Sequence, residues 1–261
     1  MGVKRMHLKR SLLLGFIIVN IMGCSTFMLQ NETAATRLGK TIKDGNTIIY
    51  NSDIYDITII GFKGNFEVLY DPQDPPSLST AGQLYGYRYL INGSYFEGSR
   101  VHAGWLSVLG ERHTPLKDDR QLSHMAVLDT SLGYLDFPDL ELWDSTMTSE
   151  ITIEFQTGPL VIHANQIDTL SIQASINGMT AHLRTFLAYT EEDGMKYFII
   201  TRHIGSLENV AHHLLSLPVF EGKTLFVMNL DGGSSTALYS RNHPELNFNT
   251  NRPLPILLGI R

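Results

Sequence analysis

The side chains best suited to chemistry gather near the end of the chain, between Phe226 and Thr236. An apolar run there ends at Asp231, and Gly232 and Gly233 follow directly. Behind the glycines stand three hydroxyl side chains: Ser234, Ser235 and Thr236. Glycines let the backbone approach a ligand and point amide N–H groups at it, and Asp231 would hold a carboxylate at a strand end, where ligands often bind. The segment indicates a ligand site; the alternative is a tight turn in which Asp231 caps the next segment.

Further polar residues stand where other apolar runs end or are interrupted. Asn92 lies at the end of one such run, and Thr157 and Gly158 lie at the end of another. Arg184 falls inside an apolar stretch, where an unpaired guanidinium would be costly to bury. These residues are candidates for the same site as Asp231.

In this order and spacing, the segments resemble the phosphodiester glycosidase family. The Asn-Gly-Gly-Phe-Phe segment of that family resembles Asn92 to Phe96 here, and its Arg-Thr pair resembles Arg184-Thr185. Its Asn-Leu-Asp-Gly-Gly-Gly-Ser segment resembles Asn229 to Ser235, and its closing Arg-x-Val-Pro resembles Arg252 to Pro255. The resemblance covers about residues 77–261. Ser94, Tyr95 and Ser234 depart from the family pattern, which bears on loop geometry and substrate choice.

Together with the secretory pattern of the N-terminus, the resemblance implies an exported hydrolase that cleaves the sugar–phosphate bond of a glycosyl-1-phosphodiester and releases free sugar. Arg184 would bind the phosphate with its planar fork, and Asp231 would stabilise positive charge that develops on the sugar ring. Asn92 would hydrogen-bond sugar hydroxyls or orient the acid. The expected substrate-binding residues are Gly232, Gly233, Ser234, Ser235, Thr157 and Gly158. Glu97 is either a second carboxylate or a solvated loop acid. The alternative function is a non-catalytic glycan-binding lipoprotein of the cell envelope.

No cofactor is predicted from the pattern of possible metal ligands. His212 and His213 are adjacent on a predicted helix and cannot both face one site, and the other histidines lack the spacing of a metal motif. The sequence leaves open a site in which residues far apart in the chain bind a divalent cation.

The N-terminus has the three parts of a secretory signal. A basic segment from Lys4 to Arg10 precedes an apolar run from Ser11 to Met22, which is shorter than a comfortable membrane span. The tetrad Ile21 to Cys24 resembles the bacterial lipobox, and Cys24 is the single cysteine of the chain. Residues 1–23 are therefore predicted to be a lipoprotein signal peptide, with lipidation at Cys24 and a membrane anchor at the cell envelope. The alternative is an uncleaved anchor helix.

Polar residues 24–43 are predicted to be a tether, and residues 44–261 a phosphodiester glycosidase-like domain. The net charge of −6 and the lack of a basic stripe beyond the signal indicate no nucleic-acid partner. Most of the domain consists of short β-branched and aromatic runs, for example 47–50, 66–70 and 196–202.

Two helices are expected in the domain. One covers about residues 77–86. The other is indicated by apolar residues that recur at helical spacing behind Ser206 as N-cap: Leu207, Val210, Ala211, Leu214 and Leu215. With so many short β-like runs, the predicted fold class is α+β, with a mixed β-sheet and few helices.

Overall fold

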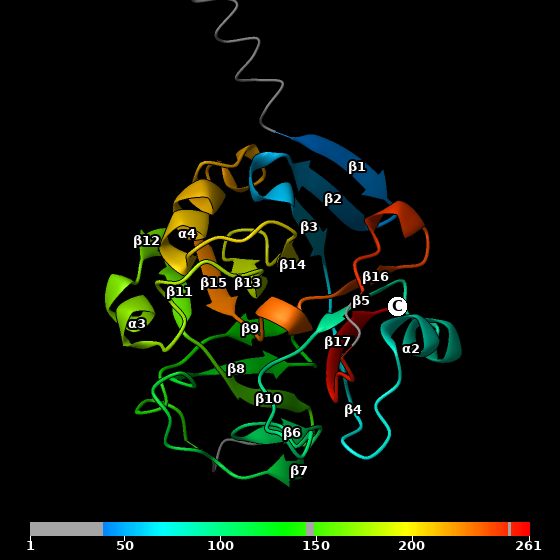
Figure 1. Ribbon diagram of the computed structural model, residues 1–261, viewed down its shortest axis with the longest axis vertical. Helices are drawn as coiled ribbons and strands as arrows, with labels where there is room; N and C mark the ends of the chain where they lie inside the picture. The colour runs from blue at the N-terminus through cyan, green and yellow to red at the C-terminus, as the bar shows by residue number, and fades with distance from the viewer. Residues whose placement is uncertain (1–38, 145–148, 250–251) are drawn as a thin grey trace, which may run out of the picture. The chain divides into compact units, whose positions relative to one another are not determined.

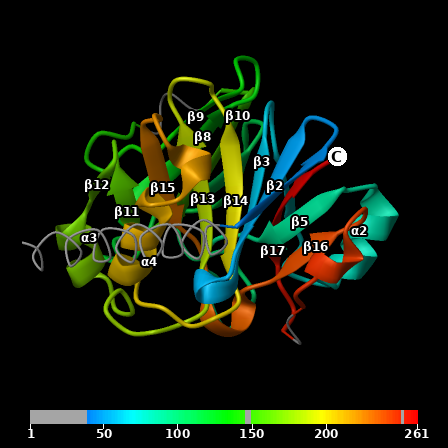
Figure 2. The same ribbon diagram turned by 90° about the horizontal axis from the view of Figure 1, so that it is seen from above.

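The strands of this protein form three antiparallel sheets (Figures 1 and 2). The computed structural model describes residues 39–144, 149–249 and 252–261. The largest sheet has eight strands in the order β1-β2-β3-β14-β13-β15-β11-β12. Their bounds in that order are Lys40–Asp44, Thr47–Ser52, Ile57–Phe62, Lys196–Thr201, Thr185–Thr190, Leu225–Asn229, Leu160–His163 and Gln166–Ile167. Cys24 and the predicted signal peptide lie outside the described residues.

Two smaller sheets pack against this one. The five-stranded sheet has the order β7-β6-β10-β8-β9, and the four-stranded sheet has the order β16-β5-β17-β4. The first comprises Glu111–Thr114, Leu106–Val108, Thr152–Thr157, His124–Asp129 and Tyr134–Asp136. The second comprises Leu238–Ser240, Tyr89–Asn92, Ile256–Ile260 and Glu67–Tyr70.

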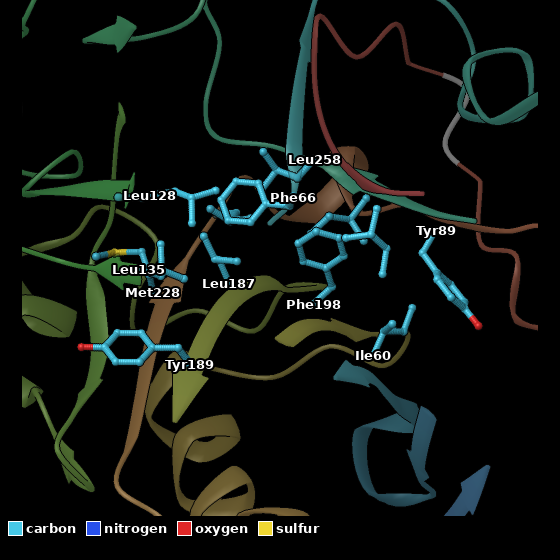
Figure 3. Packing of buried hydrophobic residues seen from close by; sticks show 14 of the residues in the cluster. Ile60, Phe66, Tyr89, Leu128, Leu135, Leu187, Tyr189, Phe198, Met228 and Leu258 are labelled. Atoms are coloured by element: carbon cyan, nitrogen blue, oxygen red, sulfur yellow. The ribbon is translucent and has the colours of Figure 1, made fainter. Parts of the chain in front are cut away.

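The alternation of side chains along the central strands explains the layers. In β13, Leu187 and Tyr189 point into the core shared with the two smaller sheets (Figure 3). Phe186 and Ala188 point to the opposite face, where helices cover the large sheet. Both faces of this strand are buried, so its four central residues are continuously apolar rather than alternating.

Few helices are present among the described residues, as expected. They are α2 (Leu78–Tyr85), α3 (Thr169–Ala174) and α4 (Leu207–Leu215), together with the short 3-10 helices η1 (Ile54–Asp56), η3 (Pro218–Phe220), η4 (Gly233–Ser235) and η5 (Pro244–Leu246). The predictions of α2 and α4 are confirmed, and Ser206 caps α4 by accepting a hydrogen bond from the Asn209 amide at 3.3 Å. The short α3 was not predicted. Among the described residues, no helix is long and apolar enough to cross a membrane.

Two sequence expectations need adjustment. Every pair of neighbouring strands in the described residues is antiparallel, so the sheets are not mixed and the fold is dominated by β-structure. The folded unit begins at Lys40, inside the predicted tether, because β1 pairs with β2 from Lys40 opposite Asn51 to Asp44 opposite Thr47. All three sheets and their apolar cores lie within residues 40–261, which is what an independently folding domain requires.

Candidate active site

Loops from several elements meet around a cavity of about 260 Å³. They follow β5, α3 and β15 and precede β8 and β13. The lining residues are Tyr95, Gln121, Asn177, His182, Arg184, Asp231, Gly232, Gly233 and Ser234. The structure thus brings Arg184 and Asp231 to one cavity, although 47 positions separate them in the sequence.

Asp231 is held in place through its backbone. Its amide donates to the Gly93 carbonyl at 3.2 Å, and its carbonyl accepts from Asn92 Nδ2 at 2.6 Å. Burial raises the pKa of the Asp231 carboxyl to about 6, while the Gly232 amide and the charge of Arg252 oppose the rise. At neutral pH the carboxyl is therefore mostly ionised, but its charge lies in a poorly solvated place.

The two glycines after Asp231 allow the turn to pack closely against the backbone of Leu183. A Cβ atom on Gly232 would lie 2.7 Å from the Leu183 carbonyl oxygen. Gly233 has a φ of +59°, in the left-handed region, and its amide donates to the same Leu183 carbonyl at 2.8 Å. The Gly233 amide is therefore engaged within the protein, and the turn locks the Asp231 segment against the segment that carries Arg184.

Arg184 supplies a buried positive charge. Its side chain is 4% exposed, with Nε donating to the Gly205 carbonyl at 3.1 Å. Nη2 donates to the carbonyls of Asn177 at 2.8 Å and Thr180 at 2.6 Å. No carboxylate of the described residues forms an ion pair with it. Burial lowers the pKa of Arg184 to about 10, so the guanidinium stays charged at neutral pH. A buried cation with only carbonyl partners favours an anionic ligand in the cavity that it lines.

Asn92 lies behind the cavity wall and is almost fully buried. Its Oδ1 accepts from Thr185 Oγ1 at 2.8 Å and from the Ala237 amide at 3.1 Å, while its Nδ2 donates to the Asp231 carbonyl. The side-chain amide is occupied by the protein, which leaves it no direct contact with a sugar. Of its two predicted roles, the geometry favours orienting the acid.

Thr157 and Gly158 also support the wall without lining the cavity. The Gly158 carbonyl accepts from the Tyr95 hydroxyl at 3.0 Å, and Asn229 Nδ2 donates to that hydroxyl at 2.6 Å. Thr157 is buried and donates to the Asn229 carbonyl at 3.0 Å. Burial raises the pKa of Tyr95, so this lining residue presents a neutral phenol.

The hydroxyl residues after the glycines do not share one environment. Ser234 lines the cavity, and its Oγ accepts from Arg252 Nη1 at 2.7 Å, with the guanidinium of Arg252 placed over the Phe96 ring. Ser235 and Thr236 are buried below the turn.

Glu97 does not reach the cavity. It is exposed and pairs with Lys117 Nζ at 3.0 Å, which agrees with a solvated loop acid. Asp231 is thus the single carboxylate among the described lining residues.

Four lining residues received no role from the sequence. Tyr95 lies inside the Asn92 to Phe96 motif and His182 lies two residues before Arg184, so closeness in sequence to the chosen residues was an available signal. Gln121 and Asn177 come from loops without any pattern, and only folding brings them to the cavity. Within the described residues, no group of three or more His, Cys, Asp or Glu side chains is arranged to hold a metal ion.

In this β-rich fold, one cavity is surrounded by an acid, an arginine and a glycine turn. This combination suits the binding of a charged ligand. The phosphodiester glycosidase family model matches residues 85–261, and the chain belongs to this family. A search of curated proteins found no match.

One solved structure shows the same fold, and a second is more distantly similar. The catalytic domain of zebrafish N-acetylglucosamine-1-phosphodiester alpha-N-acetylglucosaminidase, auto-inhibited by its pro-peptide, is 16% identical, with a TM-score of 0.59 over 85% of this chain and 81% of that one. A hypothetical protein from Synechocystis is 13% identical, with a TM-score of 0.49 over 85% of this chain and 61% of its own.

Proposed function

We propose that this chain is an exported hydrolase that cleaves the sugar–phosphate bond of a glycosyl-1-phosphodiester. The observation that carries the proposal is the pairing in one cavity of Arg184, a buried cation held only by carbonyl groups, with Asp231, the single lining carboxylate. A sugar-1-phosphodiester would present its negatively charged phosphate to Arg184 and its anomeric carbon to Asp231.

The reaction balances with water as the only co-reactant. The bond between the anomeric carbon and the bridging oxygen breaks, and its electron pair leaves with the phosphate. The oxygen of water bonds to the anomeric carbon, and one proton of water ends on the phosphate monoester. The leaving phosphate is a weak base, so its departure needs less acid assistance than the departure of an alcohol from an ordinary glycoside. A cavity with a single carboxylate is compatible with such a reaction.

Each side chain contributes a separate task. Arg184 binds the phosphate and stabilises the charge that it gains on leaving. Ionised Asp231 offsets the positive charge that develops on the sugar ring. Asn92 is a positioning residue, since it holds the Asp231 backbone and is hydrogen-bonded to Thr185 beside Arg184.

A panel of sugar-1-phosphodiesters, each assayed for released reducing sugar, tests the proposal. We expect at least one member to be hydrolysed by the wild type. If glycans bind without hydrolysis, and Asp231→Asn binds them equally well, the protein is a glycan-binding lipoprotein instead.

The cellular location is proposed from the N-terminal sequence. Lipidation at Cys24 would tether the domain to the bacterial cell envelope, and two or more acyl chains anchor a protein stably where one does not. We expect the intact protein in the membrane fraction and Cys24→Ala either released or unprocessed. Fractionation of cells expressing the two forms checks this, and unchanged attachment and processing of the variant would contradict it.

A further inference from the structure

Three large exposed apolar residues come directly before the residues whose carbonyls hold Arg184 at the cavity. Ile176 is 75% exposed, Met179 is 54% exposed and Ile204 is 62% exposed. Single exposed apolar residues are ordinary on protein surfaces, whereas a group of large ones beside a pocket indicates a binding surface. We call these three side chains the apolar rim.

The sequence positions of the apolar rim place its backbone close to the guanidinium. Ile176 precedes Asn177, and Met179 precedes Thr180. Ile204 in turn precedes Gly205. These following residues are the ones whose carbonyls accept hydrogen bonds from Arg184. Each rim side chain is therefore one residue away from a group that touches Arg184.

The two loops that carry the apolar rim are fixed by their backbones. His182 and Gly205 exchange two hydrogen bonds, at 3.2 and 2.9 Å. The Gly178 carbonyl accepts from the Leu207 amide at 3.0 Å at the start of α4. A Cβ atom on Gly205 would lie 2.7 Å from Val210 Cγ2, so this loop packs tightly on the helix. The backbone that carries the rim is thus preorganised.

We propose that the apolar rim binds the hydrocarbon chain of a lipid alcohol esterified to the phosphate, so that the substrate is an amphiphile of the form sugar–phosphate–lipid. This inference rests on the proposed function. In such a molecule the sugar would lie at Asp231, the phosphate at Arg184 and the group beyond the phosphate at the apolar rim. Charge complementarity at Arg184 fixes the phosphate and thereby brings the alcohol to the rim.

A membrane tether is compatible with this class of substrate. The lipid chain would be extracted from a bilayer, and a domain anchored at Cys24 would work next to that bilayer. A short polar alcohol would leave the three rim side chains in water and would gain nothing from them.

Binding of alkyl phosphates tests the inference without requiring turnover or knowledge of the sugar. The probes are methyl, octyl and farnesyl phosphate below their micelle-forming concentrations, titrated calorimetrically into residues 40–261. The folded unit contains all three sheets, so the tether is not needed for this measurement. We expect farnesyl phosphate to bind on the order of tenfold or more tightly than methyl phosphate, because apolar surface is buried.

The test variant is Ile176→Ser/Met179→Ser/Ile204→Ser. We expect its ratio of methyl to farnesyl dissociation constants to fall severalfold, toward one. The ratio is the readout, because partial misfolding weakens both probes alike. Leu132→Ser is the matched control, since Leu132 is 80% exposed on the turn between β8 and β9, and no residue of that turn bonds Arg184 or lines the cavity. The control should keep the wild-type ratio.

Each other outcome has a defined meaning. Equal binding of all probes by the wild type, or an unchanged ratio in the triple variant, overturns the inference. A triple variant that loses binding to phosphatidylcholine vesicles but keeps the ratio makes the rim a membrane-docking surface, which also overturns it. Hydrolysis of short phosphodiesters without any chain-length preference leaves the hydrolase standing and removes only this inference. Chain-length preference without any hydrolysis keeps the lipid-phosphate site and removes the hydrolase.

Discussion

The two charged walls of the cavity are built in different ways. The Asp231 wall is a strand end, since β15, the glycine turn and η4 follow one another within residues 225–235, and its backbone is hydrogen-bonded to Asn92 and Gly93 at the end of β5. The Arg184 wall depends on carbonyls of Asn177 and Thr180 from the loop after α3 and of Gly205, 21 positions away. One wall is a strand end, and the other is an arginine held by loops.

This difference separates two kinds of task. A charge at a strand end is fixed by the sheet, which suits a group that must act on one reacting atom. A guanidinium surrounded by loop carbonyls lies next to loop residues, and these can be substituted without disturbing the sheet. Such a place suits recognition of the alcohol on the far side of the phosphate, which can differ between substrates. Substitutions on the Asp231 wall should therefore affect turnover, and those on the Arg184 wall should affect binding.

The largest effect is expected for Asp231→Asn. Turnover should fall by about three orders of magnitude or more with little change in KM, because the lost charge acts mainly in the transition state. Steady-state kinetics on a hydrolysed phosphodiester measure both values, and thermal unfolding must confirm that the variant is folded. Near-normal turnover would reduce Asp231 to a residue that caps the turn.

Arg184→Lys is expected to have a smaller effect, on binding. Lysine keeps the charge, but its single ammonium group cannot replace Nε and Nη2 at the three loop carbonyls and also offer the Nη1 donors to the phosphate, so affinity for the phosphodiester should fall by about 10- to 100-fold. An uncharged glycoside of the same sugar should lose less. Equal losses for both substrates would mean that Arg184 only supports the loops that hold it.

The pH dependence of kcat/KM sharpens the role of Asp231. Burial raises the pKa of its carboxyl to about 6, and the ionised form is the one proposed to act. Activity should be constant above that pH and should fall about tenfold per unit below it, since kcat/KM reports groups of the free enzyme. A profile that instead falls as pH rises through 6 would show that Asp231 acts as an acid.

The smallest effect concerns stability. The pKa of Asp231 is raised from 3.8 to about 6 in the folded protein. The ionised carboxylate therefore lowers the free energy of unfolding progressively as pH rises through that interval. Asp231→Asn should therefore increase the free energy of unfolding at pH 7 by about 1–3 kcal/mol, and the gain should vanish below pH 4. Urea unfolding at both pH values measures it. A variant that is less stable at pH 7 would indicate that the carboxylate is structurally required.

The sequence by itself determined the local elements and the family motifs. The spacing of Leu207, Val210 and Leu214 predicted α4, and the run into Asp231 predicted a strand followed by a turn, as observed. These features depend on residues that are close in the chain, so hydrophobic period and turn chemistry report them directly.

Only the tertiary structure decided which residues meet. Period-two patterns give the burial of a strand but not its partner, so the antiparallel pairing could not be predicted. The contacts of Asn92 and Glu97 could not be predicted either. The Asn92 amide faces the backbone of Asp231 rather than a ligand, and Glu97 pairs with Lys117. Gln121 and Asn177 reach the cavity through loops whose paths depend on long-range packing. Contacts between residues far apart in the chain depend on the whole fold, and no local pattern records them.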